Sequence, residues 1–138
     1  MARIRPVALA IIRRGEEILV FEGYDTVKDE RFLRPLGGGI DFGEFGHDAF
    51  RREIREELGA ELTEIRHLAT VENIFTCNGE SGHEIVMLYE AAFADEALYG
   101  MDLLDGFEGT EPMPAFWVHP GRLGGRPLYP DGLSGLLG

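Results

Sequence analysis

The apolar positions at the start of the chain fall into two short runs separated by a turn. Residues Pro6–Arg13 are almost continuously apolar, Gly15-Glu16 interrupts the pattern, and Ile18–Tyr24 is apolar again. Runs of this length bounded by glycine and charged residues are typical of strands. We therefore expect a hairpin whose first strand is buried. The polar residues Asp25–Arg31 that follow predict a loop.

A different spacing marks the middle of the chain. Phe50, Ile54 and Leu58 recur every four residues, which places them on one face of a helix. We expect this helix to cover Gly46–Leu58. Gly59 follows at once, and glycine readily adopts the left-handed conformation that ends helices.

The other elements flank this helix. Three consecutive glycines, Gly37-Gly38-Gly39, break a short apolar element at Arg34–Ile40 and predict a backbone that other groups approach closely. Further strands are expected at Leu62–Ile74, Glu84–Phe93 and Phe116–Val118, with a hairpin turn at Asn78–Gly82, an irregular acidic segment at Ala94–Glu111 and a short helix near Leu133–Leu137. Strands on both sides of one strong helix predict an α/β (α+β) fold, a sandwich around a mixed β-sheet.

Composition narrows the class of protein. A length of 138 residues predicts a single domain, 1–138, and 28% charged residues is ordinary globular composition. The net charge of −12 disfavours nucleic acid and anionic membranes as partners, because both require clustered Lys and Arg. Cys77 is the only cysteine, so we expect neither an internal disulfide nor a thiolate metal site.

The longest apolar run, Val7–Ile12, is too short to span a bilayer. Arg13 and Arg14 end it before it reaches the length of a signal-peptide core. We therefore expect a cytoplasmic protein.

The predicted helix contains an unfavourable arrangement of charge. Glu53, Glu56 and Glu57 are spaced i, i+3 and i+4, so three carboxylates share one face and repel one another. They also lie toward the C-terminal end of the helix, where its dipole disfavours anions. A solvated acidic face is the simple interpretation. The alternative is a divalent cation such as Mg²⁺, which binds carboxylate oxygens, water and phosphate.

The residues around these glutamates form a longer pattern. Gly38, Glu44, Arg52, Glu53, Glu56, Glu57 and Gly59 stand in the order G-x5-E-x7-R-E-I-x-E-E-x-G. This order resembles the Nudix box, G-x5-E-x7-R-E-U-x-E-E-x-G-U, in which U is a bulky aliphatic residue. All seven fixed identities are present within Gly38–Ala60. Ile54 fills the first U position, whereas Ala60 is small for the last.

The resemblance to the Nudix hydrolase family implies a Nudix-like α/β/α sandwich and hydrolysis of a nucleoside diphosphate linked to another moiety, with Mg²⁺ (or Mn²⁺) as cofactor. By position, the metal ligands would be Glu56, Glu57, Glu53 and the carbonyl oxygen of Gly38. Glu53 would also orient and deprotonate the attacking water, and Arg52 would hold Glu53 by an ion pair. Glu44 would support the loop or a further metal.

Residues outside the pattern add candidates for substrate binding. Arg34 and Arg31 precede the glycines, and either could hold a phosphate through its guanidinium fork. Gly39 is a third candidate for substrate binding. The competing interpretation is that both arginines are surface residues of an acidic protein.

A further carboxylate from beyond the box is expected in this family. Glu84 shares one face of its strand with Val86 and Leu88, which makes it the least ordinary candidate. Glu90, Glu96, Glu108 and Glu111 are the alternatives. Phe32, Phe42, Phe75 and Trp117 could stack on a nucleobase or belong to the core.

Two functions from different classes agree with these observations. The first is a metal-dependent pyrophosphohydrolase, and the second is a non-catalytic nucleotide-binding or sensor module with the same fold. The complete set of carboxylates favours the enzyme. No proline lies between Glu61 and Glu111, and the first tyrosine there is Tyr89. Within the family, the lack of a proline there and the distance of the first tyrosine from the box favour a nucleoside triphosphate (NTP or dNTP) or a modified nucleotide as substrate. A homodimer is one candidate assembly.

Overall fold

The fold is built on a mixed sheet with the first strand at its centre. The computed structural model describes residues 2–137, so Met1 and Gly138 of the predicted domain 1–138 lie outside it. The strands are β1 (Ile4–Arg14), β2 (Glu17–Asp25), β3 (Glu30–Arg34), β4 (Leu36–Gly39), β5 (Leu62–Cys77), β6 (Glu80–Phe93), β7 (Leu103–Leu104), β8 (Phe107–Glu108), β9 (Glu111–Pro112) and β10 (Ala115–Val118). The helices are α1 (Gly46–Leu58), η1 (Glu96–Gly100, a 3₁₀ helix) and α2 (Leu133–Leu137).

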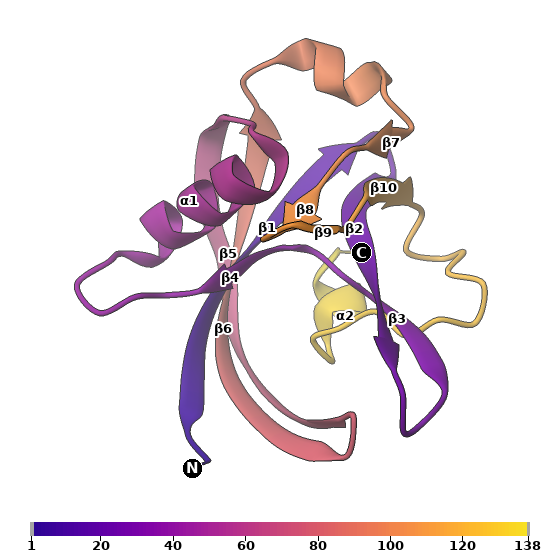
Figure 1. Cartoon of the computed structure of the whole chain (residues 1–138). Helices are drawn as coiled ribbons and strands as arrows, with labels where there is room; N and C mark the ends of the chain where they lie inside the picture. Colours follow the sequence, from indigo (N-terminus) through magenta and orange to yellow (C-terminus); the bar gives the residue numbers. More distant parts are fainter. Residues whose placement is uncertain (1, 138) are drawn as a thin grey trace.

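Strand β1 changes partners along its length. Over residues 4–12 it pairs in parallel with β6, and over residues 7–10 it pairs on its other side with β4. Its last residues, Arg13 and Arg14, pair with the start of β2. Strand β2 then pairs with both β3 and β10, and β5 lies outside β6 (Figure 1). The predicted mixed sheet is confirmed.

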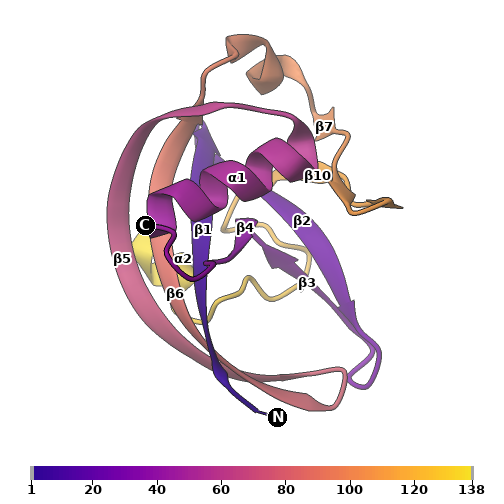
Figure 2. The same ribbon diagram turned by 60° about the vertical axis from the view of Figure 1, so that its left-hand side comes forward.

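The helices α1 and α2 cover opposite faces of this sheet. Figure 2 shows α1 lying across one side of the strands and α2 on the other. Ala8, Ala10 and Ile12 of β1 pack in the core cluster under α1, whereas Val7 and Leu9 belong to the second cluster, which includes Leu133 of α2. Because both faces of β1 are buried, its sequence is a continuous apolar run without alternation.

Helix α1 has the predicted bounds. Its residues Ala49, Phe50 and Ile54 are buried. Gly59 has a φ of 67° and donates its backbone N–H to the Arg55 carbonyl oxygen, 2.9 Å away. The helix therefore ends where the sequence predicts, with its carboxylate-bearing turn fixed against the sheet.

The β5–β6 hairpin is longer than the sequence predicts. The expected strands stop at Ile74 and begin again at Glu84, but pairing continues to Cys77 and Glu80. Asn78 and Gly79 form the two-residue connection, with φ of 54° and 79°. Two successive positive φ angles match the twist of a hairpin, so the tight turn allows both strands to extend (Figure 1).

The segment Ala94–Glu111, predicted to be irregular, contains η1, the two-residue strands β7 and β8, and the first residue of β9. A Cβ atom at Gly106 would lie 2.4 Å from the Met113 carbonyl oxygen and 3.1 Å from Leu58 Cδ2. This glycine lets the β8–β9 ribbon pack closely against the end of α1. The predicted strand near Trp117 and the short helix Leu133–Leu137 are both present.

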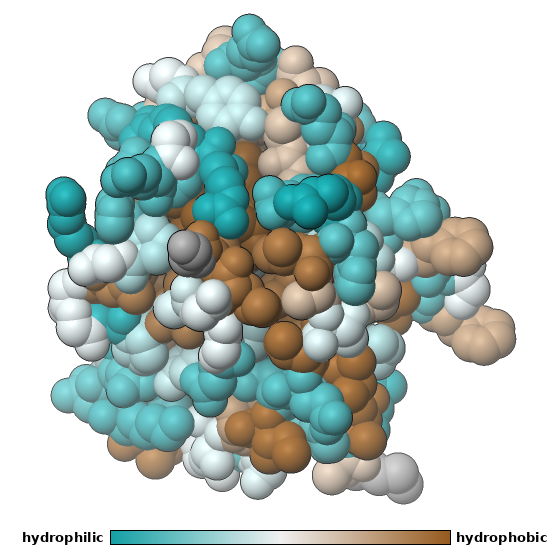
Figure 3. Space-filling model, turned by 180° about the vertical axis from the view of Figure 1, so that it is seen from behind, coloured by the Kyte–Doolittle hydropathy of each residue, from teal (hydrophilic) through white to brown (hydrophobic). Residues whose placement is uncertain are grey.

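The rear surface is partly apolar. Figure 3 shows apolar side chains in the middle of this face, surrounded by polar ones. Among the helices of residues 2–137, none is long and apolar enough to cross a membrane.

Candidate active site

A cleft of about 790 Å³ lies where the glycine strand, helix α1 and the β8–β9 ribbon meet. Its floor is Gly37–Gly39 of β4, and one wall is formed by the glutamates of α1. The residues that line it are Arg5, Val7, Phe21, Glu22, Gly23, Tyr24, Phe32, Arg34, Gly37, Gly38, Gly39, Glu53, Glu56, Glu57, Cys77, Asn78, Phe107, Glu108, Gly109 and Met113. Most of the residues predicted to form the site therefore meet in one place.

The glycines of β4 permit two close approaches. Gly37 has a φ of 145°, and a Cβ atom there would lie 2.1 Å from the Ala8 carbonyl oxygen. A Cβ atom at Gly38 would lie 2.6 Å from the carboxylate carbon of Glu53. Any side chain at Gly38 would displace Glu53, so this glycine brings the helix carboxylate against the strand.

Arg52 connects the loop before α1 to the glutamates of α1. Its Nε and Nη2 atoms donate to the two carboxylate oxygens of Glu44, at 2.9 and 3.0 Å. Its Nη1 donates to Glu53 Oε1 at 2.8 Å, and Nη2 also donates to the Gly39 carbonyl oxygen at 3.2 Å. The hydrogen bonds from Arg52 hold the pKa of Glu44 below its ordinary value. Arg52 thus pairs with Glu44 and Glu53 at the same time.

Glu57 is the most unusual carboxylate of this helix. It is buried, at 8% exposure, and its Oε1 atom has no hydrogen-bond partner. Burial is the largest cause that raises its pKa to about 8, followed by repulsion from Glu53, Glu108 and Glu56. The positive charge of Arg34 acts in the opposite direction, but its effect is the smallest of these, so a charged carboxylate is poorly compensated here. Glu56, by contrast, is exposed and lies 3.6 Å from Arg52.

These residues fit a hard divalent cation. No three His, Cys, Asp or Glu side chains within residues 2–137 are already arranged around a metal position. The unpartnered oxygen of Glu57 and its repulsion from neighbouring carboxylates are nevertheless what a cation would relieve. Carboxylate and carbonyl oxygens are also the ligands that Mg²⁺ prefers.

Arg5 and Arg34 form a basic wall of the cleft, and both pair with Glu84. This residue is 3% exposed, and its carboxylate oxygens lie 3.3 Å from Arg34 Nη2 and 3.6 Å from Arg5 Nη1. Both arginines line the cleft. The structure therefore pairs Glu84 with two guanidinium groups, whereas the sequence suggested it as a further acid. Arg5 was not a candidate, because only the pairing of β1 with β6 places it opposite Glu84.

Among the carboxylates that the sequence offered from beyond the box, Glu108 is the one that lines the cleft. It also contributes to the raised pKa of Glu57. The sequence included it among several alternatives, since nothing local shows that β8 packs on α1. Glu90 instead pairs with Arg66 at 2.7 Å. Glu96 and Glu111 lie in η1 and β9.

The remaining predicted residues lie at the edge of the site or in the core. Arg31 is exposed, pairs with Glu22 at 3.1 Å and stacks on Tyr24, and both partners line the cleft. Phe42 is fully exposed. Trp117 is buried and donates its indole N–H to the Met101 carbonyl oxygen, so it belongs to the core.

Comparison with known proteins identifies the family. The family model described as NUDIX domain matches residues 3–130. The crystal structure of a MutT NUDIX hydrolase from Burkholderia pseudomallei is 26% identical, with 97% of this chain and 96% of that chain covered and a TM-score of 0.72. The solution structure of the E. coli ORF135 protein is 25% identical, with 99% and 87% covered and a TM-score of 0.61.

A more distant structure shares the fold alone. An ADP-ribose pyrophosphatase from Streptococcus suis is 15% identical, with 96% of this chain and 86% of that chain covered and a TM-score of 0.63. The chain belongs to the NUDIX family. It is an enzyme of the Nudix hydrolase class, which confirms the resemblance and the fold predicted from the sequence.

Proposed function

We propose that this enzyme is a divalent-metal-dependent pyrophosphohydrolase that cleaves a nucleoside diphosphate linked to another moiety, with a nucleoside triphosphate or a modified nucleotide as its substrate. The observation that carries the proposal is the buried, unpartnered carboxylate of Glu57 beside Glu53 and Glu56 in the cleft. The similar MutT NUDIX hydrolase agrees with this class of reaction.

The acidic wall would hold the metal. Glu53, Glu56, Glu57 and the Gly38 carbonyl oxygen supply the ligands. When bound, the cation would lower the pKa of a coordinated water and neutralise the charge that develops on the phosphate. Arg52 keeps Glu53 in one orientation, so that its carboxylate can accept a proton from the attacking water. Glu44 positions Arg52 through its two hydrogen bonds.

The basic wall would hold the phosphates. Arg5 and Arg34 both line the cleft, and a guanidinium group binds phosphate oxygens through two parallel hydrogen bonds. Gly39, whose missing side chain leaves the backbone accessible, lies between the two walls. Arg31 would contribute from the edge of the cleft, next to Tyr24.

The net charge of −12 favours a free nucleotide over a nucleic acid strand as the substrate. A phosphoanhydride ligand arrives with its own bound cations, whereas a nucleic acid requires a basic surface. We propose that the enzyme works in the cytoplasm, where such nucleotides are made.

A substrate panel tests the proposed function. Nucleoside triphosphates, modified nucleotides and dinucleotides are incubated with Mg²⁺ or Mn²⁺, and the products are separated to locate the broken bond. We expect cleavage of a phosphoanhydride bond that requires the cation. Binding without cleavage of any compound would support the sensor module instead.

A further inference from the structure

A groove continues from the cleft toward the start of the chain. It lies between the first residues of the chain and the end of the β5–β6 hairpin, which Figure 1 shows at the lower edge of the molecule. Its volume is about 440 Å³. Arg5, Cys77 and Asn78 line both the groove and the cleft. The groove and the cleft therefore form one continuous depression.

Two arginines follow each other along this depression. Arg3 and Arg5 are two residues apart in extended chain, so their side chains lie on the same side, and both line the groove. Arg5 stands at the junction with the cleft, because a Cβ atom at Gly39 would lie 3.0 Å from Arg5 Nη2. Arg3 comes about 7 Å farther along the chain, from the rise of a strand. A second guanidinium group is thus available beyond the one that faces the proposed phosphate site.

The two arginines differ in their partners. Arg5 lies 3.6 Å from the buried carboxylate of Glu84, which also pairs with Arg34. Arg3 forms no ion pair with the residues that the structure describes, although the chain holds 25 acidic residues against 13 Lys and Arg. An exposed arginine without a role would simply be solvated. An unpaired guanidinium group that lines a groove next to a phosphate site can instead bind an anion.

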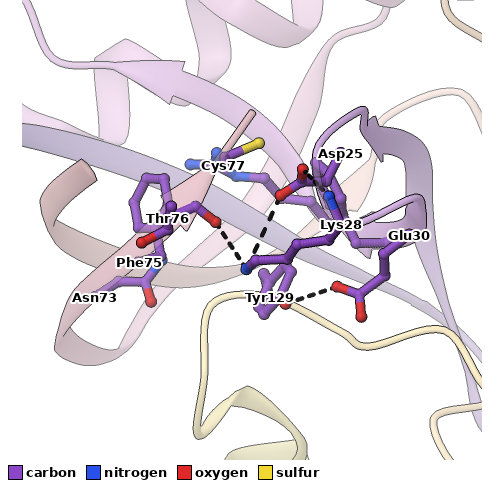
Figure 4. Close-up of a pocket in the computed structure, with 10 residues that line it drawn as sticks. Asp25, Lys28, Glu30, Asn73, Phe75, Thr76, Cys77 and Tyr129 are labelled. Atoms are coloured by element: carbon purple, nitrogen blue, oxygen red, sulfur yellow. Dashed lines mark hydrogen bonds and ion pairs between the residues drawn. The ribbon is translucent and has the colours of Figure 1, made fainter. Parts of the chain in front are cut away.

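The opposite wall of the groove is held in place from the other side. Lys28 of the β2–β3 hairpin donates from Nζ to the Thr76 carbonyl oxygen at 2.8 Å (Figure 4). Asn78 Oδ1 accepts hydrogen bonds from the backbone N–H and the hydroxyl group of Thr26, at 2.8 and 3.0 Å. These contacts tie the end of the β5–β6 hairpin to the β2–β3 hairpin. The groove is therefore preformed, and a ligand needs to order little of the hairpin when it binds.

We propose that this groove binds a phosphate monoester of the substrate, separate from the diphosphate that is cleaved, and so selects nucleotides that carry an additional phosphate. The proposal rests on the proposed function, since the diphosphate must lie in the cleft for the second phosphate to reach Arg3. A phosphate offers several acceptor oxygens to the planar guanidinium fork. An uncharged moiety gains nothing comparable from Arg3, and a nucleic acid strand requires a larger basic surface than two arginines provide.

Pairs of diphosphates that differ by one phosphate monoester test the groove. NADP⁺ is compared with NAD⁺, and coenzyme A with dephospho-coenzyme A. Binding is measured by calorimetry with Ca²⁺ in place of Mg²⁺, because Ca²⁺ also binds oxygen ligands and its looser coordination should slow cleavage. We expect the phosphorylated member of at least one pair to bind about tenfold more tightly than its partner. Equal binding within both pairs overturns the proposal.

Substitutions assign the preference to the groove. Arg3→Gln removes the exposed guanidinium group and should abolish the preference, whereas Arg3→Lys keeps the charge without the fork and should retain part of it. Glu80→Gln removes an exposed negative charge from the groove and should strengthen the preference. The matched control is Arg122→Gln, because Arg122 is exposed and lines neither the groove nor the cleft. A preference that survives Arg3→Gln, or that Arg122→Gln abolishes equally, overturns the proposal.

Two further measurements separate the alternatives. Inorganic phosphate is titrated alone, and if it binds as tightly as the phosphorylated ligands and depends on Arg3, the groove is a site for free phosphate and the proposal is overturned. Hydrolysis is then followed with Mg²⁺ or Mn²⁺. If the protein shows the binding preference but cleaves no compound, the proposed function fails and the groove assignment stands. If it cleaves diphosphates but binds both members of each pair equally, the groove assignment fails and the proposed function stands.

Discussion

At the scale of single residues, the site depends on one arginine and one buried glutamate. Arg52 has its donors divided among Glu44, Glu53 and the Gly39 carbonyl oxygen. Glu57 has the opposite situation, with an oxygen that receives no hydrogen bond. Arg52 has several hydrogen-bond partners, whereas Glu57 Oε1 has none among the described residues, so the two side chains should respond differently to substitution.

Replacing Arg52 by lysine should remove the planar fork while keeping the charge. Lysine cannot bond Glu44 and Glu53 in the same geometry, so Glu53 loses its fixed orientation. We expect kcat to fall by about 100-fold. Arg55→Lys is the control, because Arg55 is exposed and pairs only with Glu61 among the described residues. Steady-state kinetics of both variants checks this prediction, and equal, small effects would contradict it.

Glu57 should make the stability of the metal-free protein depend on pH. Its pKa is raised to about 8 in the folded state, so the folded state holds this proton more tightly than the unfolded chain does. The contribution of Glu57 to the free energy of unfolding is therefore greatest below the unfolded pKa, near 4.5, and is lost as pH rises through about 8. We expect a loss on the order of a few kcal/mol.

Denaturant unfolding in EDTA, at about pH 5 and about pH 9, measures this effect. In Glu57→Gln, the loss between the two pH values should largely disappear, although the variant should also be inactive. Glu72→Gln serves as control, since Glu72 is 74% exposed. The assignment is wrong if Glu57→Gln is much less stable than wild type at high pH.

At the scale of elements, local sequence predicted some features and tertiary packing determined others. The bounds of α1 follow from the four-residue spacing of Phe50, Ile54 and Leu58 and from Gly59, all within one segment. Glu108 could not be assigned, because its place in the cleft depends on packing of β8 against α1. Ala60, the departure from the box pattern, is 7% exposed and belongs to the core under the helix.

The pairing of strands also determines the neighbours of Glu84. From the sequence it was one acid beside an apolar face, but parallel pairing of β1 and β6 places Arg5 opposite it. Register of this kind is set by contacts between segments about 80 residues apart, so no local pattern reveals it.

Removing the charge of Glu84 should weaken substrate binding more than catalysis. Glu84→Gln loosens the hold on Arg5 and Arg34, so we expect KM to rise about tenfold with a smaller change in kcat. Glu90→Gln is the matched control, because Glu90 also lies on β6 and pairs with an arginine of β1, Arg13 at 3.8 Å. A kinetic comparison at low and high salt tests this. A large fall in kcat with unchanged KM would instead support a metal or base role for Glu84.

At the scale of the whole molecule, the glutamates of the cleft link the stability of the fold to the proposed cation. The chain has a net charge of −12, and five glutamates line one cleft: Glu22, Glu53, Glu56, Glu57 and Glu108. A cation that binds the folded state and not the unfolded chain stabilises the fold by mass action.

Divalent cations should therefore raise the melting temperature as well as activate the enzyme. We expect a rise of a few degrees when Mg²⁺ is present at about 100 times its dissociation constant, and loss of activity in EDTA. The shift should shrink in Glu56→Gln, which lacks a proposed ligand, and persist in Glu72→Gln. Full turnover in excess EDTA would contradict the metal requirement.

The partner change along β1 has a mechanical consequence. The glycine strand β4 is hydrogen-bonded to residues 7–10 of β1, and β2, which contributes residues 21–24 to the cleft, is bonded to residues 13 and 14. Both β4 and β2 are thus held by the same strand, so these two sides of the cleft belong to one sheet. The β8–β9 ribbon is a separate two-stranded sheet. We expect its amide protons to exchange with solvent faster than those of Val7–Ile12. Opening of the ribbon, and not bending of the sheet, should then limit the rate of substrate entry.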